Sequence, residues 1–190
     1  MTTPAPNPTL ARWKSISRRI RVPAGFVFVL VYVWLAAPSP RSIVWSLLLV
    51  VPGLLLRAWA SGHVRKNAAL ATSGPYAYTR NPLYLGSMLI AYGFAAASRS
   101  LWVVGVLTVL FLVIYWPVIL SEEEFLRGRF PEFSAYTRRV PRLIPRLALA
   151  ANRPRGEFSF ALYRQHREYN SLLGSIFLYA ALAVIFALRR

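Results

Sequence analysis

The sequence has no cysteine and no aspartate and only two histidines, and these absences exclude several kinds of site. Without cysteine, neither a disulfide framework nor a thiolate metal site can form. A metal centre would have to be built from His63, His166 and six glutamates, and we predict none. Negative charge is also scarce, because 23 lysines and arginines give the chain a formal net charge of +17.

Apolar residues are abundant and are concentrated in five blocks, at about 22–37, 42–60, 83–97, 101–120 and 171–188. A transmembrane helix needs about 20 apolar residues. The second, fourth and fifth blocks approach that length, while the third can gain length from Pro82 and the residues before it. The sequence therefore predicts an all-α polytopic membrane bundle of about five transmembrane helices. Pro52 and Pro117 lie inside spans, where each favours a kink.

The order of these blocks predicts one membrane domain over residues 1–190. It comprises a basic cytoplasmic arm (1–21), four spans (22–120), a cytoplasmic cap (121–170) and a fifth span with its tail (171–190). The linkers 38–41 and 98–100 are short and predict tight helical hairpins. The first block has the basic flank and small-residue end of a signal peptide, but a second block follows at once, so we expect a retained span.

The basic residues lie between the apolar blocks, mostly in the N-terminal arm, the loop between the second and third blocks, and the segment 127–167. A strongly basic chain can bind nucleic acid, but this placement is typical of residues that meet anionic lipid headgroups. We therefore predict no nucleic-acid partner. By the positive-inside rule, the N-terminus and both long polar segments are expected to be cytoplasmic.

Two segments hold most of the remaining polar groups. The first, SGPYAYTRNPLYLG over residues 73–86, contains the turn signals Gly-Pro and Asn-Pro, with Pro82 suited to the first turn of a helix. Gly86 and Gly93 share one helix face, which favours either close helix packing or close approach of a ligand. The second segment begins with Glu122, Glu123 and Glu124 at the expected end of the fourth helix, where the helix dipole disfavours negative charge. These carboxylates could bind an ammonium or hydroxyl groups, or they could pair with the arginines that follow, which is the simplest explanation.

Together these two segments resemble the isoprenylcysteine carboxyl methyltransferase family, which belongs with the phospholipid methyltransferases. The family pattern is roughly G-x-Y-x-x-x-R-H-P-x-Y-x-G, then E-E-x-x-L-x-x-x-F-G and R-V-P-x-x-x-P. The first part falls on Gly74, Tyr76, Arg80, Pro82, Tyr84 and Gly86. The second falls on Glu122, Glu123, Leu126, Phe130, Arg139, Val140, Pro141 and Pro145.

The resemblance covers about residues 74–145 and has three departures. Asn81 replaces the family histidine, so this position keeps hydrogen-bonding capacity but cannot titrate. Pro131 replaces the glycine after Phe130, and the stretch between Phe130 and Tyr136 is one residue short. The geometry of this cytoplasmic loop is therefore expected to differ from that of the family.

The resemblance implies that S-adenosylmethionine binds at the cytoplasmic ends of the third and fourth spans. Glu122 or Glu123 would then accept hydrogen bonds from its ammonium or ribose, and Arg80 or a cap arginine would hold its carboxylate. Gly86 would allow close approach, and tyrosine rings would surround the adenine and the sulfonium. The expected donor-binding set is Tyr76, Tyr78, Arg80, Asn81, Pro82, Tyr84, Gly86, Glu122, Glu123 and Tyr136.

The expected acceptor is a lipophilic small molecule or lipidated substrate that enters from the bilayer. Arg139 and Arg142 would steer an acceptor carboxylate, whereas an amine or phenol would need a general base, such as Glu123 or another cap glutamate or tyrosine. Glu168 precedes the fifth span beside Arg167, and we expect an interfacial ion pair there, with support of the donor site as the alternative.

Two other functions are compatible with parts of this pattern. Membrane sterol reductases resemble the donor-binding half of the family and use NADPH, although their chains are usually much longer. A non-catalytic lipid-binding membrane module would explain the spans and the charge, but neither the three consecutive glutamates nor the ordered pair of motifs. A soluble Rossmann methyltransferase is excluded because no G-x-G-x-x-G follows a predicted strand.

Overall fold

The computed structural model describes residues 23–65, 68–146 and 156–189, and the ordered elements in these ranges are helices without a strand. They are the helix Pro23–Leu35, α2 (Pro40–Ser61), the 3₁₀ turn η1 (Gly74–Ala77), α3 (Pro82–Ala97), α4 (Leu101–Leu110), the π-helical turn η2 (Phe111–Tyr115), α5 (Trp116–Arg129), α6 (Phe133–Arg139), α7 (Phe160–Gln165) and α8 (Tyr169–Leu188). The predicted all-α class is confirmed. The basic arm lies outside the described residues, as do Arg153 and Arg155.

Within the described ranges, three helices are long and apolar enough to cross a membrane: α2, the continuous helix Leu101–Arg129 and α8. The helices Pro23–Leu35 and α3 are shorter, as the sequence predicted for the first and third blocks. Large apolar side chains cover the outer sides of these helices, including Trp45 and Phe177, which are 68% and 73% exposed. Such surfaces are stable against lipid rather than water, so the chain is an integral membrane protein.

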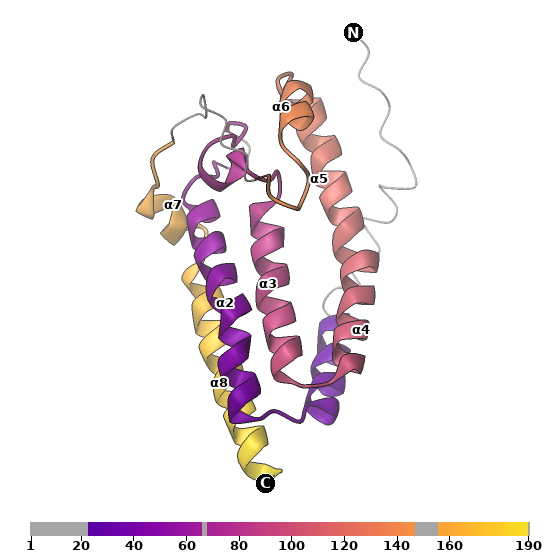
Figure 1. Ribbon diagram of the computed structural model, residues 1–190. Coiled ribbons are helices and arrows are strands. Elements are labelled where there is room, and N and C mark those ends of the chain that lie inside the picture. The colour runs from indigo at the N-terminus through magenta and orange to yellow at the C-terminus, as the bar shows by residue number, and fades with distance from the viewer. Residues whose placement is uncertain (1–22, 66–67, 147–155, 190) are drawn as a thin grey trace.

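All these long helices run side by side, and α3 lies between α2 and the α4–α5 helix (Figure 1). The short helices α6 and α7 and the loop between α2 and α3 gather at one end, which we call the polar end. The hairpin linkers lie at the opposite end, as predicted, between Leu35 and Pro40 and between Ala97 and Leu101. Arg189 also lies there and donates hydrogen bonds to carbonyls at the end of the first helix, including that of Val33 at 2.7 Å.

The helices α2 and α3 form the most extensively packed pair. A Cβ atom on Gly86 would lie 2.8 Å from the Gly53 carbonyl oxygen and 2.6 Å from Arg57 Cγ. Only glycine therefore allows the two backbones to approach this closely. Of the two roles considered for Gly86, the structure shows helix packing.

The third span begins at Pro82 and includes no residue before it. Pro82 is the first residue of α3, and Asn81 has the non-helical angles φ −126° and ψ 56°. The proline ring disfavours the helical conformation in the residue that precedes it. Extension of the third span before Pro82 was therefore a wrong expectation.

The fourth span is longer than its apolar block, because α4, η2 and α5 form one helix that ends at Arg129. The π-helical turn stands just before Pro117, whose ring removes one backbone donor and clashes with the preceding turn. The three glutamates consequently lie within α5, and Arg127 and Arg129 occupy its last turn. The expectation that the glutamates end the helix was wrong, and the basic last turn agrees with the helix dipole.

Candidate functional site

A cavity of about 670 Å³ lies at the polar end, among α2, α3, α5 and α6. We call it the polar cavity. Its volume falls within the range of about 300–1,000 Å³ that is typical of small-molecule sites. Its walls are formed by Arg57, Val64, Arg65, Ala69, Leu70, Ala71, Tyr76, Arg80, Asn81, Pro82, Leu83, Tyr84, Ser87, Tyr115, Glu122, Glu123, Phe125, Leu126, Phe130, Phe133 and Tyr136.

Two loops form the wall of the cavity at its polar side: the entry loop before α3 (residues 73–81) and the α6 segment (residues 130–146). The backbone N–H of Arg80 donates to the Pro141 carbonyl at 2.9 Å, and that of Arg146 donates to the Tyr78 carbonyl at 3.1 Å. The Tyr136 hydroxyl donates to the Tyr76 carbonyl at 2.7 Å. The two motifs identified in the sequence are therefore bonded directly to each other.

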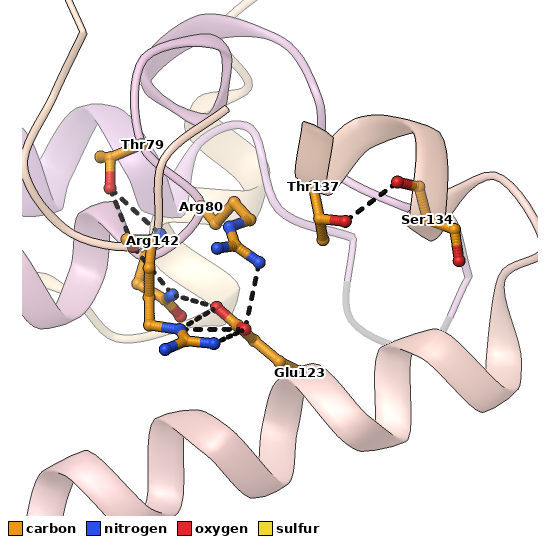
Figure 2. A network of polar contacts seen from close by, with 7 residues as sticks. Thr79, Arg80, Glu123, Ser134, Thr137 and Arg142 are labelled. Atoms are coloured by element: carbon orange, nitrogen blue, oxygen red, sulfur yellow. Dashed lines mark hydrogen bonds and ion pairs between the residues drawn. The ribbon is translucent and has the colours of Figure 1, made fainter. Parts of the chain in front are cut away.

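Glu123 is the centre of this arrangement and is only 4% exposed. Its carboxylate accepts hydrogen bonds from Arg80 Nη1 at 3.1 Å, from Asn81 Nδ2 at 3.2 Å, and from Arg142 Nη2 at 3.0 Å and Nε at 3.1 Å (Figure 2). Figure 2 shows the two guanidinium groups converging on this one carboxylate from the two loops. This carboxylate thus has charge-assisted hydrogen bonds from both guanidinium groups, and these bonds join both loops to α5.

Arg80 retains hydrogen-bonding capacity after pairing with Glu123. Its Nε is buried and is the only such side-chain atom without a partner in the described parts of the chain. Burial lowers the pKa of Arg80, and the Glu123 carboxylate opposes this effect, so the guanidinium is charged at neutral pH. A buried donor without an acceptor is costly, which suits a position that an anionic ligand completes.

Glu122 differs from its neighbour. It is exposed, it lines the polar cavity, and within the described ranges it makes no hydrogen bond or ion pair. Burial raises the pKa of the Tyr76 and Tyr136 phenols, and these rings stand in the same cavity wall. The tyrosines are thus neutral hydrogen-bonding groups at physiological pH, and Glu122 is an available anion beside them.

Arg57 is a cavity residue that the sequence analysis missed. Its Nε and Nη2 donate to the two carboxylate oxygens of Glu168 at 2.6 and 3.0 Å, and its Nη1 donates to the Ser87 hydroxyl. The ion pair expected for Glu168 is therefore present, and its partner is Arg57. The signal was present, because Arg57 is the only charged residue of the block 42–60, and an ionisable residue within a span indicates a functional or paired position.

Most of the predicted donor-binding residues come together around the polar cavity: Tyr76, Arg80, Asn81, Pro82, Tyr84, Glu122, Glu123 and Tyr136. Four predicted site residues do not line it. The ring of Tyr78 packs 6.2 Å from Trp59, and Gly86 packs against α2. Arg142 is engaged by Glu123 and by the face of Trp116, 5.4 Å away, and Arg139 is exposed on α6.

The departures from the family pattern have local explanations. Asn81 donates from one amide nitrogen both to Glu123 and to the Arg142 carbonyl, at 3.2 and 3.0 Å. The asparagine thus joins the two loops without a titratable ring. Pro131 follows the end of α5, where a proline cannot continue the helix, and the short turn leads directly into α6.

A comparison with known proteins agrees with these observations. The family model of the phospholipid methyltransferases matches residues 24–132, more than half of the chain. The cobalt-zinc-cadmium resistance protein CzcN of Cupriavidus metallidurans is 39% identical over 127 residues, which cover 66% of this chain and 57% of that protein. The nickel-cobalt-cadmium resistance protein NccN of Alcaligenes xylosoxydans xylosoxydans is 38% identical over 95 residues, which cover 49% of this chain and 45% of that protein.

No solved structure gives a significant match. The alignments span only about half the length of the two curated relatives. The matched family region contains α2, the entry loop, α3 and the glutamates of α5, which build most of the polar cavity, while α6 lies beyond it. With this match over most of its membrane region, the chain belongs to the phospholipid methyltransferase family, which includes the membrane enzymes that resemble isoprenylcysteine carboxyl methyltransferase.

Proposed function

We propose that this protein transfers a methyl group from S-adenosylmethionine to a lipophilic acceptor at the cytoplasmic face of a membrane. The observation that carries the proposal is the composition of the polar cavity. This cavity, which lies beside apolar spans, contains the exposed carboxylate of Glu122 and several tyrosine rings. It also contains Arg80, whose buried Nε–H has no partner among the described residues. The donor has a matching set of groups: an ammonium, a sulfonium, a carboxylate and an adenosine.

The residues of the cavity fit this donor by charge. Glu122 would accept hydrogen bonds from the ammonium or the ribose, and Arg80 would hold the carboxylate through its unpartnered Nε. The faces of Tyr76, Tyr84 and Tyr136 would stabilise the cationic part and the adenine. When bound, the donor supplies an electrophilic methyl group on a sulfonium.

The role of Glu123 is to position these groups. It holds Arg80, Asn81 and Arg142 at once, so it fixes the entry loop and the α6 segment around the cavity. Neutral Tyr76 and Tyr136 complete the part of the cavity wall that these two loops form. Methyl transfer depends mainly on such positioning and desolvation.

The acceptor would come from the bilayer, because lipid-facing helices flank the cavity. For an acceptor carboxylate, Arg142 or Arg139 would provide the steering charge. For an amine or a phenol, Glu122 is the base candidate with a free carboxylate, while Glu123 is fully paired.

The charges at the polar end support the cytoplasmic orientation. Arg127, Arg138 and Arg139 are exposed there, on α5 and α6. Arginines at this level would meet anionic headgroups of the cytoplasmic leaflet and fix the topology. We infer that these headgroups are contacts of the protein in its membrane.

The names of the two relatives refer to metal resistance. Among the described residues, no three side chains of histidine, aspartate or glutamate are grouped as metal ligands would be. From these names we propose that any contribution of this chain to metal resistance acts through the membrane component that it methylates.

The proposal is tested by calorimetric titration of the detergent-solubilised protein with S-adenosylhomocysteine and, separately, with NADPH. We expect binding of the first and none of the second; the reverse result would favour the reductase. Glu122→Gln and Arg80→Ala should each weaken S-adenosylhomocysteine binding about tenfold, the effect of one charge-assisted hydrogen bond. Glu132→Gln, an exposed glutamate away from the cavity, is the matched control. A correctly folded protein that does not bind S-adenosylhomocysteine contradicts the proposal.

A further inference from the structure

The short helix α7 lies beside the end of α2 on the outer side of the bundle, and its residues do not line the polar cavity (Figure 1). Phe158, just before α7, and Phe160, its first residue, are 47% and 62% exposed. The Phe160 ring stacks on that of Tyr163, with the two centroids 5.6 Å apart. Exposed rings that gather in one place indicate a contact surface, because water solvates them poorly.

The level of α7 relative to the membrane follows from its neighbours. Before α7, the backbone N–H of Ser159 donates to the Gly62 carbonyl at 3.0 Å. After α7, the ring nitrogen Nδ1 of His166 lies 3.2 Å from the carbonyl oxygen of Ser61, the last residue of α2. The other membrane-crossing helix, α8, begins shortly afterwards at Tyr169. Both ends of α7 are therefore held at the level where α2 and α8 leave the membrane.

The charges around these rings are mainly positive. Arg164 on α7 and Arg167 just after it are exposed, and within the described ranges neither forms an ion pair. Of the neighbouring glutamates, Glu168 is buried and paired with Arg57, while Glu157 is exposed. Aromatic rings bordered by arginines match the interface of a bilayer, where rings reach the acyl boundary and guanidinium groups meet phosphates.

We propose that the α7 segment (residues 158–167) is an interfacial anchor that binds the bilayer leaflet at the polar end. Phe158 and Phe160 enter the boundary between headgroups and acyl chains, and Arg164 and Arg167 contact lipid phosphates. The partner is the bilayer rather than another protein, because the segment leads directly into the start of α8, where large apolar side chains are exposed to lipid. The anchor is separate from the arginines of α5 and α6, which lie on the other side of α3 (Figure 1).

The anchor is joined to the wall of the polar cavity through the end of α2. A Cβ atom on Gly62 would overlap the Phe158 ring, and the centroid of the His63 ring lies 6.2 Å from that of Phe158. Val64 and Arg65, which line the polar cavity, follow directly in the sequence. The anchor therefore holds the α2 side of the cavity at a fixed depth in the leaflet. It does not depend on the reaction and so adds to the proposed function.

The test uses the absence of cysteine, since a single introduced cysteine is then the only site for a thiol-reactive nitroxide label. The label is attached to Phe160→Cys in the full chain, which is reconstituted in vesicles of phosphatidylcholine and phosphatidylglycerol. Power saturation in electron paramagnetic resonance measures exposure of the label to oxygen, which concentrates in lipid, and to a nickel chelate, which stays in water. We expect the label to lie about 5–10 Å below the headgroup boundary, as the apolar face of an interfacial helix does.

Two labelled positions provide the references: Phe177→Cys on the lipid-facing side of α8, and Glu132→Cys at an exposed residue before α6. The label at position 160 should be shallower than the first and less exposed to the nickel chelate than the second. Ala161→Cys, at an exposed residue of α7, is a second reporter that keeps both phenylalanine rings. Adding Phe160→Gln should move this reporter toward water. Adding Ile144→Gln, at an 80% exposed residue outside the α7 segment, should leave its depth unchanged.

Exposure to the nickel chelate at positions 160 and 161 equal to that at position 132 would overturn the anchor, because α7 would then stand in water. Low exposure to both reagents would also overturn it, because a protein surface, such as a second copy of this chain, would then cover α7. Neither measurement involves S-adenosylhomocysteine. Failure of the anchor is therefore distinguishable from failure of the methyltransferase proposal, which donor titration tests.

Discussion

Two buried glutamates organise this protein in different ways. Glu123 joins the two family motifs at the polar end through three side chains from two loops. Glu168 joins α8 to α2 through the single cation Arg57, together with the Ser171 hydroxyl at 2.6 Å. Both carboxylates are less than a tenth exposed, yet only the first lies in a recognised motif.

The comparison shows that the family motifs contain the residues that hold the walls of the polar cavity together. They do not contain every residue that lines this cavity, since Arg57 lies outside them. Glu123 and its partners lie in segments with a recognisable order of residues. Arg57 and Glu168 are 111 positions apart and come together only when α8 packs against α2. Breaking each pair separately therefore distinguishes assembly of the polar cavity from attachment of the last helix.

The largest effect is expected for Glu123→Ala. The substitution leaves Arg80 and Arg142 without their shared carboxylate, and loss of one partner of a buried ion pair destabilises a protein by about 3–5 kcal/mol. Thermal unfolding in detergent should show a clear decrease in Tm, and S-adenosylhomocysteine binding should be lost. Glu132→Ala is the control, since Glu132 is exposed. Wild-type Tm and binding in Glu123→Ala would refute its organising role.

Glu168→Ala should have a smaller effect on stability, of about 2–3 kcal/mol, below the range for fully buried pairs. Arg57 is 23% exposed and keeps its contacts with Ser87 and Leu83. Protease susceptibility of α8 should increase, while S-adenosylhomocysteine affinity should remain within about twofold of wild type, because Glu168 lies outside the polar cavity. Glu157→Ala, at an exposed glutamate, is the control. If Glu168→Ala and Glu123→Ala lost S-adenosylhomocysteine binding equally, the two glutamates would not have different roles.

Gly86→Ala tests the helix pair that carries Arg57. The added Cβ would lie 2.6 Å from Arg57 Cγ and 2.8 Å from the Gly53 carbonyl, and overpacking of this kind costs about 1–3 kcal/mol. The Tm should therefore decrease. Gly128→Ala on α5 is the matched control, because a Cβ there meets no atom and the helix gains up to about 1 kcal/mol. A Tm that rises in both variants would contradict the close α2–α3 contact.

Tyr136→Phe should have the smallest effect, a loss of about 1 kcal/mol, because it removes one neutral hydrogen bond to the Tyr76 carbonyl. The pH dependence provides a second measurement. Burial raises the folded-state pKa of Tyr136, so its contribution to stability is complete below the unfolded value of about 10 and is lost as the pH rises toward the folded value. The alkaline decrease in Tm should be shallower in Tyr136→Phe than in wild type. Tyr169→Phe, at a 41% exposed tyrosine, should not alter the alkaline decrease.

Much of the architecture could be predicted from local sequence. Apolar block length identified the long and short helices, the short linkers identified the hairpins, and Pro82 marked the start of α3. The end of the fourth helix could not be predicted from hydropathy, because α5 continues into water as an ordinary polar helix as far as Arg129. The motifs contain many of the residues that line the polar cavity. They do not show that Glu123 is paired while Glu122 is exposed, because this depends on which face of α5 meets the two loops.

The sequence by itself determined that this chain is an α-helical membrane protein of the phospholipid methyltransferase family, because hydropathy and motif order are properties of neighbouring residues. Only the tertiary structure decided which charges are available and which are paired. Glu123 forms ion pairs with two arginines, Glu122 lines the polar cavity, and Arg57 forms an ion pair with Glu168. Pairing within a bundle depends on helix rotation and on contacts between distant segments, and no local pattern encodes these.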